Sequence, residues 1–425
     1  METTLFIGGA LAFILGGMPI SFALGLATLI YMLLSGIPPV TLIQQLSRGI
    51  NSFTLLALPF FILAGQLMNY GGITAKIFRF ANALVGHIRG GLAHANILAA
   101  MVFASIAGSA VAVAGALGTV QLDEMKRNGY DERFSIGLMS AAMTIGPVIP
   151  PSVVMVVYGI AASVPIGPLF IGGIIPGILM GLVLMGYVMW RAVKGNFPRY
   201  HERFSIRELW NSFRKAGFAL MAPLIIIGGI IGGVFTATEA GAAAVVYSFV
   251  VGFFYYKELT LQKFFQALVD TMMLSATILL IMGMSSSFSF VLAFERIPAE
   301  LAQLLSGIST DPSVILLILM GFYLILGCFI EAIAIIAMTI PVVLPVIKVL
   351  GVDPIHFGVI LAINMSLGTI TPPLGIVLYV MARVGKMPVL SVARASLVPF
   401  LLLTALLVVF VYVPGFSTFL PSLAR

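Results

Sequence analysis

Hydrophobic runs separated by short polar stretches follow one another along almost the whole chain. Most of these runs approach or exceed the roughly 20 residues that an α-helix needs to cross a bilayer. They recur from Leu5 to Val413, and no segment between them is long and polar enough to form a soluble domain. The pattern predicts an all-α polytopic membrane protein in which a single membrane bundle occupies residues 1–425.

Two of the hydrophobic runs are broken midway by the motif Gly-x-x-x-Pro-Pro, at residues 146–151 and 368–373. Two consecutive prolines remove two backbone donors and push the preceding residue out of the helical region, so a helix cannot continue straight through them. In lipid, an unwound backbone is tolerated only where protein or a polar cavity surrounds it. The broken helices, predicted at 134–163 and 356–382, therefore indicate a binding site between them.

A pair of short apolar arms precedes each broken helix. The first arms, 92–103 and 110–125, are too short or too rich in small residues to be comfortable spans. The second pair, 314–326 and 332–350, encloses a tip at 327–331. We predict that each pair forms a re-entrant hairpin.

The two halves of the chain repeat with an offset of 222 positions. Chance would match a few small apolar residues, but it would not match turn glycines, aspartates and double prolines in one register. Counting spans from the basic loops places the opening of the first hairpin on the cytoplasmic side and that of the second on the outer side, which predicts an inverted repeat. The matched pairs include Lys126 with Lys348, Gly129 with Gly351, Asp131 with Asp353, Gly146 with Gly368, Pro150 with Pro372 and Pro151 with Pro373.

The composition agrees with a membrane setting, since 60% of the residues are hydrophobic and only 9% are charged. The densest basic stretch, between Arg191 and Lys215, is placed in the cytoplasm by the positive-inside rule. Orientation and anionic lipid headgroups explain the net charge of +7 better than a nucleic-acid partner does. The predicted divisions are scaffold and arm helices at 1–90 and 218–310, transport halves at 91–190 and 311–415, and a basic cytoplasmic linker at 191–217.

The hairpin tips, 105–109 and 327–331, are separated by the same 222 positions, so each tip should face its own Pro-Pro break. Exposed carbonyl oxygens there suit a small hard cation such as sodium, while the N-termini of half-helices suit an anionic substrate. The alternative for each motif is a simple kink in a packed helix.

Among the carboxylates, Glu331 stands in an otherwise apolar stretch and is a functional candidate because its burial is costly. The alternatives are a structural hydrogen bond or a position at a watery hairpin mouth. Glu239, Asp131 and Asp353 follow turn-forming or capping residues, so we interpret them as helix caps.

Sequence motifs of enzymes are absent from the chain. Its four histidines are scattered, and neither a zinc-protease, a dinucleotide-binding nor a phosphate-loop motif occurs. A single cysteine, Cys328, excludes an internal disulfide and suits a small core residue. A membrane-embedded enzyme is therefore a remote alternative, and no cofactor is expected. Because re-entrant hairpins are repeated beside broken helices, alternating access is favoured over a channel with a fixed pore.

Five sequence blocks, in order, carry a resemblance to a known family: 58–65 (Leu-Pro-Phe-Phe-Ile-Leu-Ala-Gly), 108–112, 146–151, 233–240 and 368–375. Over essentially its full length the chain resembles the large membrane subunit of tripartite ATP-independent periplasmic (TRAP) transporters.

The resemblance implies a sodium-driven importer of organic acids in the bacterial inner membrane. A periplasmic substrate-binding protein would feed it, and a small four-helix membrane subunit would be bound to it. The implied fold is similar to that of divalent-anion/sodium symporters, in which a transport domain moves as an elevator. A stand-alone sodium/organic-anion symporter is the nearest alternative.

The family's site residues transfer to this chain position by position. Substrate contacts fall on Ser109 and Glu331. The chain departs from the usual family pattern at Val113, where the first hairpin commonly has aspartate, and at Glu331, where the second does. The implied sodium ligands, mainly backbone oxygens, are Ser105, Gly146, Val148 and Pro150 in one half and Gly327, Gly368, Thr371 and Leu374 in the other.

Overall fold

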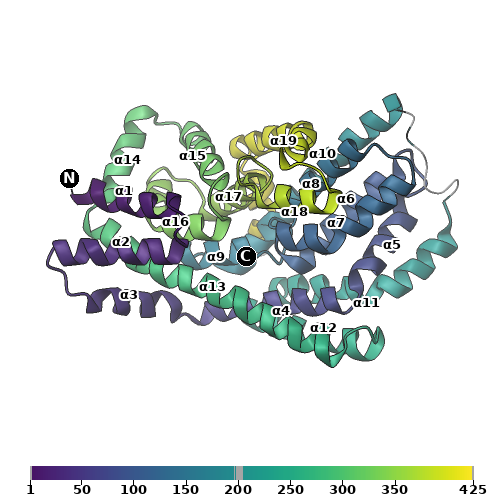
Figure 1. The fold of residues 1–425 in the computed structure, drawn as a ribbon, viewed down its shortest axis with the longest axis horizontal. Helices are drawn as coiled ribbons and strands as arrows, with labels where there is room; N and C mark the ends of the chain where they lie inside the picture. Colours follow the sequence, from purple (N-terminus) through teal and green to yellow (C-terminus); the bar gives the residue numbers. More distant parts are fainter. Residues whose placement is uncertain (1, 196, 198–203, 424–425) are drawn as a thin grey trace.

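The computed structural model describes residues 2–195, 197 and 204–423. Every regular element in this described part is a helix, as Figure 1 shows. Within these described residues, seven helical stretches are long and apolar enough to cross a membrane, which agrees with the predicted all-α polytopic fold. They are Phe53–Tyr70, Ile166–Gly195, Ile206–Ile231, Ala237–Tyr255, Leu261–Phe294, Ala332–Val349 and Val389–Tyr412.

The helices follow one another along the chain with short connections. The first half contains α1 (Glu2–Leu15), α2 (Ile20–Leu34), α3 (Val40–Ile50), the 3₁₀ turn η1 (Phe53–Leu56), α4 (Ala57–Tyr70), α5 (Ile73–Val85), α6 (Gly91–Ala107), α7 (Ala110–Arg127), α8 (Glu132–Met143), α9 (Val153–Ala162) and α10 (Ile166–Gly195). The second contains α11 (Ile206–Ile231), α12 (Ala237–Val250), the π-helical turn η2 (Val251–Tyr255), α13 (Leu261–Phe294), α14 (Ile297–Ile308), α15 (Pro312–Gly327), α16 (Ala332–Val349), α17 (Pro354–Gly368), α18 (Ile376–Gly385), α19 (Val389–Tyr412) and α20 (Gly415–Leu423).

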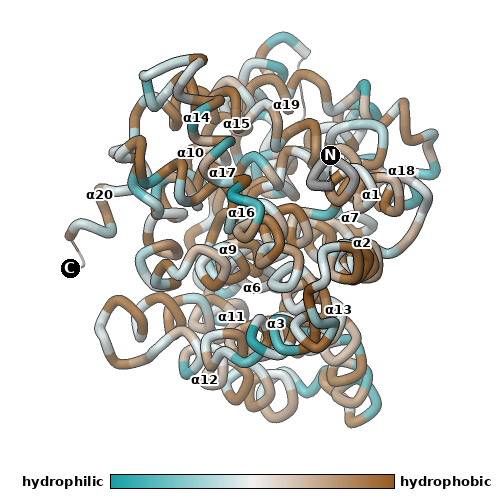
Figure 2. Tube along the Cα trace, turned by 90° about the vertical axis from the view of Figure 1, so that its left-hand side faces the viewer, coloured by the Kyte–Doolittle hydropathy of each residue, from teal (hydrophilic) through white to brown (hydrophobic). Residues whose placement is uncertain are grey.

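The helices form two layers. Figures 1 and 2 both place α3, α11, α12 and α13 on the lower side of the molecule, with α10, α14, α15, α17 and α19 above them. Hydrophobic residues predominate along most of the trace in Figure 2, on the surface as well as inside, as expected where lipid replaces water.

The predicted hairpins and broken helices correspond to real elements. Helices α6 and α7 form the first hairpin and α15 and α16 the second, while α8 with α9 and α17 with α18 are the two broken helices. The leading half of each broken helix is buried without interruption, over Phe134–Met143 in α8 and Ile355–Gly368 in α17. A helix that is apolar on all sides belongs in the middle of a bundle, and these two occupy that position.

The hydrophobic run at the start of the chain forms two helices, α1 and α2, which pack against each other, and Gly17 adopts φ +87° in the turn between them. Within the region 218–310, predicted as scaffold and arm helices, α13 continues as one helix from Leu261 to Phe294. Helices α10 and α11 extend into the basic stretch, and α20 was not predicted at all.

Asp131, Asp353 and Glu239, the carboxylates that the sequence indicates as helix caps, do cap helices. The Asp131 carboxylate accepts a hydrogen bond from Phe134 N at 2.8 Å, and the Asp353 carboxylate accepts one from Ile355 N at 2.7 Å. Glu239 completes a capping box with Thr236 at the start of α12. The repeat-related aspartates therefore start α8 and α17, the helices that lead into the breaks.

Each hairpin tip is joined to the Pro-Pro break of its own half by a backbone hydrogen bond. In the first half, Val153 N donates to Gly108 O at 3.4 Å. In the second half, Leu374 N donates to Cys328 O at 3.0 Å. These contacts partner backbone groups that the unwound segments cannot satisfy within a helix.

Two glycines permit this close approach. Gly108 has φ +60°, and a Cβ atom there would lie 2.8 Å from Pro151 O. A Cβ atom on Gly368 would lie 3.0 Å from the Cα atom of Gly327. Any side chain at either position would push a hairpin tip away from its break.

We expect Asp131→Ala and Asp353→Ala each to lower the free energy of unfolding by about 1 kcal/mol, because each removes the acceptor of an N-cap hydrogen bond. The Asn variants should retain most of the stability, since an amide oxygen can accept the same bond. Chemical denaturation of the purified protein in detergent measures the difference. Equal losses in the Ala and Asn variants would contradict a capping role.

We also expect Gly108→Ala to destabilise the fold by more than about 1 kcal/mol, because alanine is strained at positive φ. Gly368→Ala should act in the same direction through its contact with Gly327. The matched control is Gly115→Ala in α7, where a Cβ atom meets nothing within 4 Å; it should leave stability unchanged or raise it. The same unfolding assay compares the three, and loss of stability in all of them alike would refute the proposed close contact.

Candidate functional site

A cavity of about 880 Å³ lies between the two hairpins and the two broken helices. Both hairpin tips contribute to its wall, as do residues of α9, α17 and α18. Helices α4 and α13 close another part of the wall with Ile62, Gln66, Asn69, Thr277 and Ile281. Residues from both halves of the repeat therefore share one internal space.

Four helices begin at this cavity. Ala110, Val153, Ala332 and Ile376 are the first residues of α7, α9, α16 and α18, and all four line the wall. The first turn of a helix has unpaired N–H groups and carries the positive end of the helix dipole. Their convergence creates an environment suited to a negatively charged group.

Glu331 is the one charged side chain among the described residues that line the cavity. It occupies the N-cap position of α16, but its carboxylate does not cap that helix. Ser109, its equivalent 222 positions earlier, occupies the N-cap of α7 and likewise makes no side-chain capping bond. The two predicted substrate contacts, Ser109 and Glu331, thus line one cavity in the structure. Neither side chain makes a capping hydrogen bond to its own helix.

The predicted sodium ligands of the second half lie around one tip–break junction. Gly327 and Leu374 line the cavity, and Gly368 lies against Gly327. Thr371 O accepts a hydrogen bond from Gly375 N at 3.1 Å, and the Thr371 hydroxyl donates to Leu367 O at 2.9 Å. A carbonyl oxygen has two lone pairs, so one turn hydrogen bond leaves capacity for a second partner.

In the first half, Gly146, Val148 and Pro150 all lie in the buried segment between α8 and α9. Gly146 faces the first hairpin, because a Cβ atom built on it would lie 3.3 Å from Ala110 N and 3.2 Å from a methyl carbon of Val113. Val113 therefore places an apolar side chain against the break. Ser105 belongs to α6, and its side chain lies outside the described part of the structure.

Sequence reasoning missed the contribution of α4 and α13 to the cavity wall. Gln66 and Asn69, three residues apart in α4, are the signal that was available: two amides on one face of an otherwise apolar span. Cys328, interpreted as a small core residue, is indeed buried but also lines the cavity.

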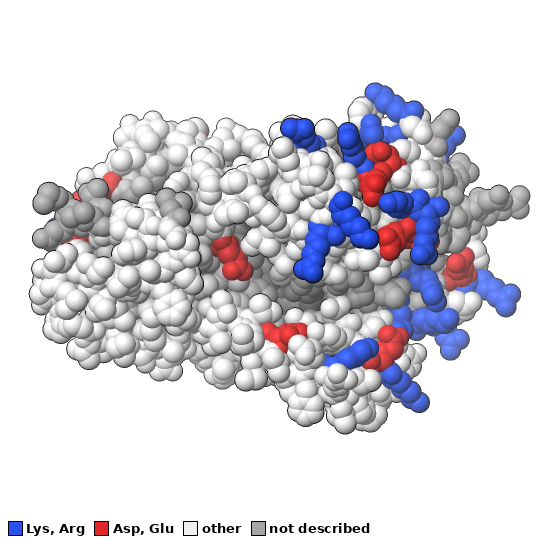
Figure 3. All heavy atoms as spheres, viewed as in Figure 1, with Lys and Arg blue, Asp and Glu red and all other residues white. Residues whose placement is uncertain are grey.

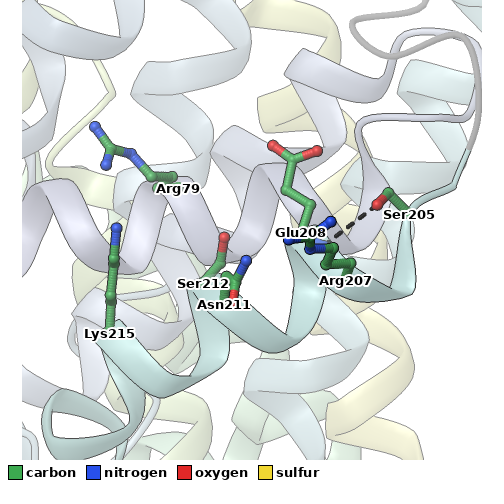
Figure 4. A pocket seen from close by; sticks show the side chains of 7 residues that line it. All are labelled: Arg79, Ser205, Arg207, Glu208, Asn211, Ser212 and Lys215. Carbon is green, nitrogen blue, oxygen red and sulfur yellow. Dashed lines mark hydrogen bonds between the residues drawn. The ribbon is translucent and has the colours of Figure 1, made fainter.

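Among the described residues, two smaller cavities away from this site have linings that include none of the predicted site residues. One, of about 310 Å³, lies between the start of α17 and α20. The other, of about 290 Å³, lies between α5 and α11 and is shown in Figure 4. This second cavity belongs to the end of the molecule where Lys and Arg side chains gather in Figure 3.

Comparison with known proteins identifies the family. Residues 7–416 match the model of the tripartite ATP-independent periplasmic transporter, DctM component. A solved structure, the YdaH transporter of Alcanivorax borkumensis, is similar in fold with a TM-score of 0.60 and 17% sequence identity, covering 88% of each chain.

Several curated relatives are more similar in sequence. The sialic acid TRAP transporter large permease protein SiaM of Vibrio cholerae is 40% identical over 98% of both chains. The C4-dicarboxylate TRAP transporter large permease protein DctM of Pseudomonas aeruginosa is 41% identical over 87% of this chain and 86% of that one. The isethionate TRAP transporter permease protein DctMQ of Oleidesulfovibrio alaskensis is 37% identical, covering 96% of this chain and 64% of its own.

These matches extend over nearly the whole chain, and the relatives carry the names of permease subunits rather than enzymes. Together with the seven apolar helices found in the described part of the chain, they make this a multi-pass protein of the inner membrane. The chain belongs to the DctM-component family, the large membrane subunits of TRAP transporters.

Proposed function

We propose that this large permease subunit imports organic acids with sodium as the coupling ion, by an elevator movement of its hairpins and broken helices. A periplasmic substrate-binding protein delivers the acid, and a small four-helix membrane subunit supports the assembly. The observation that carries the proposal is the meeting of four helix N-termini and two tip–break junctions at one cavity.

That the substrates are organic acids is inferred from the electrostatics of the cavity wall. The N-termini of α7, α9, α16 and α18 offer N–H donors and positive dipole ends to a carboxylate. The Ser109 hydroxyl can donate to the substrate, and Glu331 can accept from a hydroxyl, ammonium or protonated acid group. Relatives are named for sialic acid, C4-dicarboxylates and isethionate, all of which are acids.

The C-terminal ends of helices at the same tip–break junctions have the negative polarity that suits a sodium ion. Gly327 and Gly368 are the last residues of α15 and α17, where carbonyl oxygens lack helical partners and the dipole is negative. Sodium bound there would neutralise part of the charge of the incoming acid. Binding of the ion and binding of the acid would then stabilise each other, which is the energetic basis of symport.

The arrangement of the helices supports an inverted repeat and alternating access. In Figure 1 the hairpin α6–α7 lies toward the end that carries the basic side chains in Figure 3, and the hairpin α15–α16 lies toward the opposite end. Short segments, 86–90 and 309–311, connect the predicted scaffold to the two hairpins. Pseudo-symmetric halves can exchange conformations, which exchanges inward and outward access.

We predict that proteoliposomes containing this chain and its small partner accumulate a radiolabelled organic acid only with an inward sodium gradient and the binding protein together. A choline gradient is the control for ionic strength. Uptake that does not need the binding protein would favour the stand-alone symporter, and uptake without sodium would contradict the proposed ion sites.

Glu331→Gln should reduce uptake by roughly ten- to a hundred-fold, because hydrogen bonds that involve a charged group contribute about 1.5–3 kcal/mol. Glu300→Gln is the matched control, since Glu300 is an exposed carboxylate in α14 outside the cavity. The sodium concentration for half-maximal uptake should stay unchanged in both variants. A shift of that value in Glu331→Gln would instead make Glu331 an ion ligand.

A further inference from the structure

The cavity between α5 and α11 has a cationic wall that the transport reaction does not use. Its volume is about 290 Å³. Arg79 contributes from α5, and the remaining lining residues come from the start of α11 or the position before it. They are Ser205, Arg207, Glu208, Asn211, Ser212 and Lys215.

The sequence of α11 places these polar groups on one side of the helix. Arg207, Asn211 and Lys215 are spaced four residues apart, so they line up along one face. Figure 4 shows Glu208, Ser212 and Lys215 projecting from this region of α11, with Arg79 supplied by the neighbouring helix. The side chain of Ser212 is buried at the base, and Ser205 caps the helix by accepting from Glu208 N at 3.3 Å.

The charges of the cavity do not balance. Arg79, Arg207 and Lys215 supply three positive charges, and Glu208 supplies the single carboxylate among the lining residues. No described ion pair involves any of the three cations. The wall therefore has a surplus of two positive charges around a space of about 290 Å³, which favours an anionic occupant.

Apolar side chains flank the same turns of α11. Ile206 is 76% exposed, Trp210 is 60% exposed and Phe213 is 42% exposed. Phe213 also packs against Phe80 of α5, with ring centroids 6.0 Å apart. Exposed tryptophan and phenylalanine beside basic residues are typical of the level where lipid headgroups meet acyl chains.

We propose that this cavity binds the phosphodiester headgroup of an anionic membrane lipid. Arginine pairs with phosphate oxygens through two parallel N–H donors, lysine adds a point charge, and the Asn211 amide supplies a neutral donor. The exposed apolar side chains favour a lipid over a soluble phosphate, because they offer contacts that only acyl chains can use. Basic pockets between helices on the cytoplasmic side are suited to such headgroups.

A lipid bound here would connect two helices that are far apart in sequence. Helix α5 leads through residues 86–90 into α6, the first arm of the hairpin, while α11 is one of the helices predicted as scaffold. The headgroup would hold α5 against α11 at the basic end of the molecule. This role is independent of the substrate and of the coupling ion.

The test compares lipid binding to the purified complex of this chain and its small partner in neutral detergent. Native mass spectrometry and thermal unfolding are measured during titration with dioleoylphosphatidylglycerol or dioleoylphosphatidylcholine. The wild-type complex should bind the anionic lipid at least tenfold more tightly and show the larger increase in melting temperature. The triple variant R79Q/R207Q/K215Q should lose this preference.

The matched control is R127Q/R133Q/R394Q, which removes three exposed positive charges outside the cavity and should keep the preference. If the triple variant fails to fold, the single variants Arg79→Gln and Lys215→Gln replace it, each with an expected two- to fivefold loss. An unchanged preference in these variants would overturn the proposal. Inorganic phosphate or glycerol phosphate that displaces the lipid at equal concentration would overturn it too, because the site would then belong to a soluble anion.

Discussion

The fold depends on how the backbone of two unwound segments is satisfied inside an apolar bundle. Each Pro-Pro break removes donors from a helix that runs through the core, and lipid offers no replacement. The structure supplies partners from the hairpin of the same half, through Val153 N to Gly108 O and Leu374 N to Cys328 O. The hairpin and the broken helix of each half are therefore joined directly through their backbones.

That constraint also generates the chemistry of the cavity. A helix that stops and restarts exposes carbonyl oxygens at one end and N–H groups at the other. Because two breaks and two hairpin tips meet, positive helix ends at Ala110, Val153, Ala332 and Ile376 surround the same space as the negative end at Gly327. In the function proposed above, the anion and cation sites both arise from this backbone geometry, and the Glu331 side chain selects among substrates.

Much of this architecture could be predicted from sequence because it rests on local rules. Double prolines and turn glycines determine backbone geometry wherever they occur, so the breaks, the hairpins and the caps at Asp131 and Asp353 were predictable. Tertiary packing determined the rest. Helix α13 continues as one helix from Leu261 to Phe294, and its packing beside α4 places Gln66 and Thr277 in the same cavity wall. Gln66 and Asn69 indicate a polar face on α4, but the packing of α4 against other helices decides that this face lines the cavity.

We propose that ion and acid both bind in the cavity between the hairpin tips. Cys328, the only cysteine of the chain, lies in its wall and reports on occupancy. The most direct measurement is the rate at which N-ethylmaleimide modifies Cys328 in the purified complex, in sodium or choline, with and without a transported acid. We expect sodium and the acid together to slow modification more than either alone. A rate that is the same in all four conditions would contradict binding at this cavity.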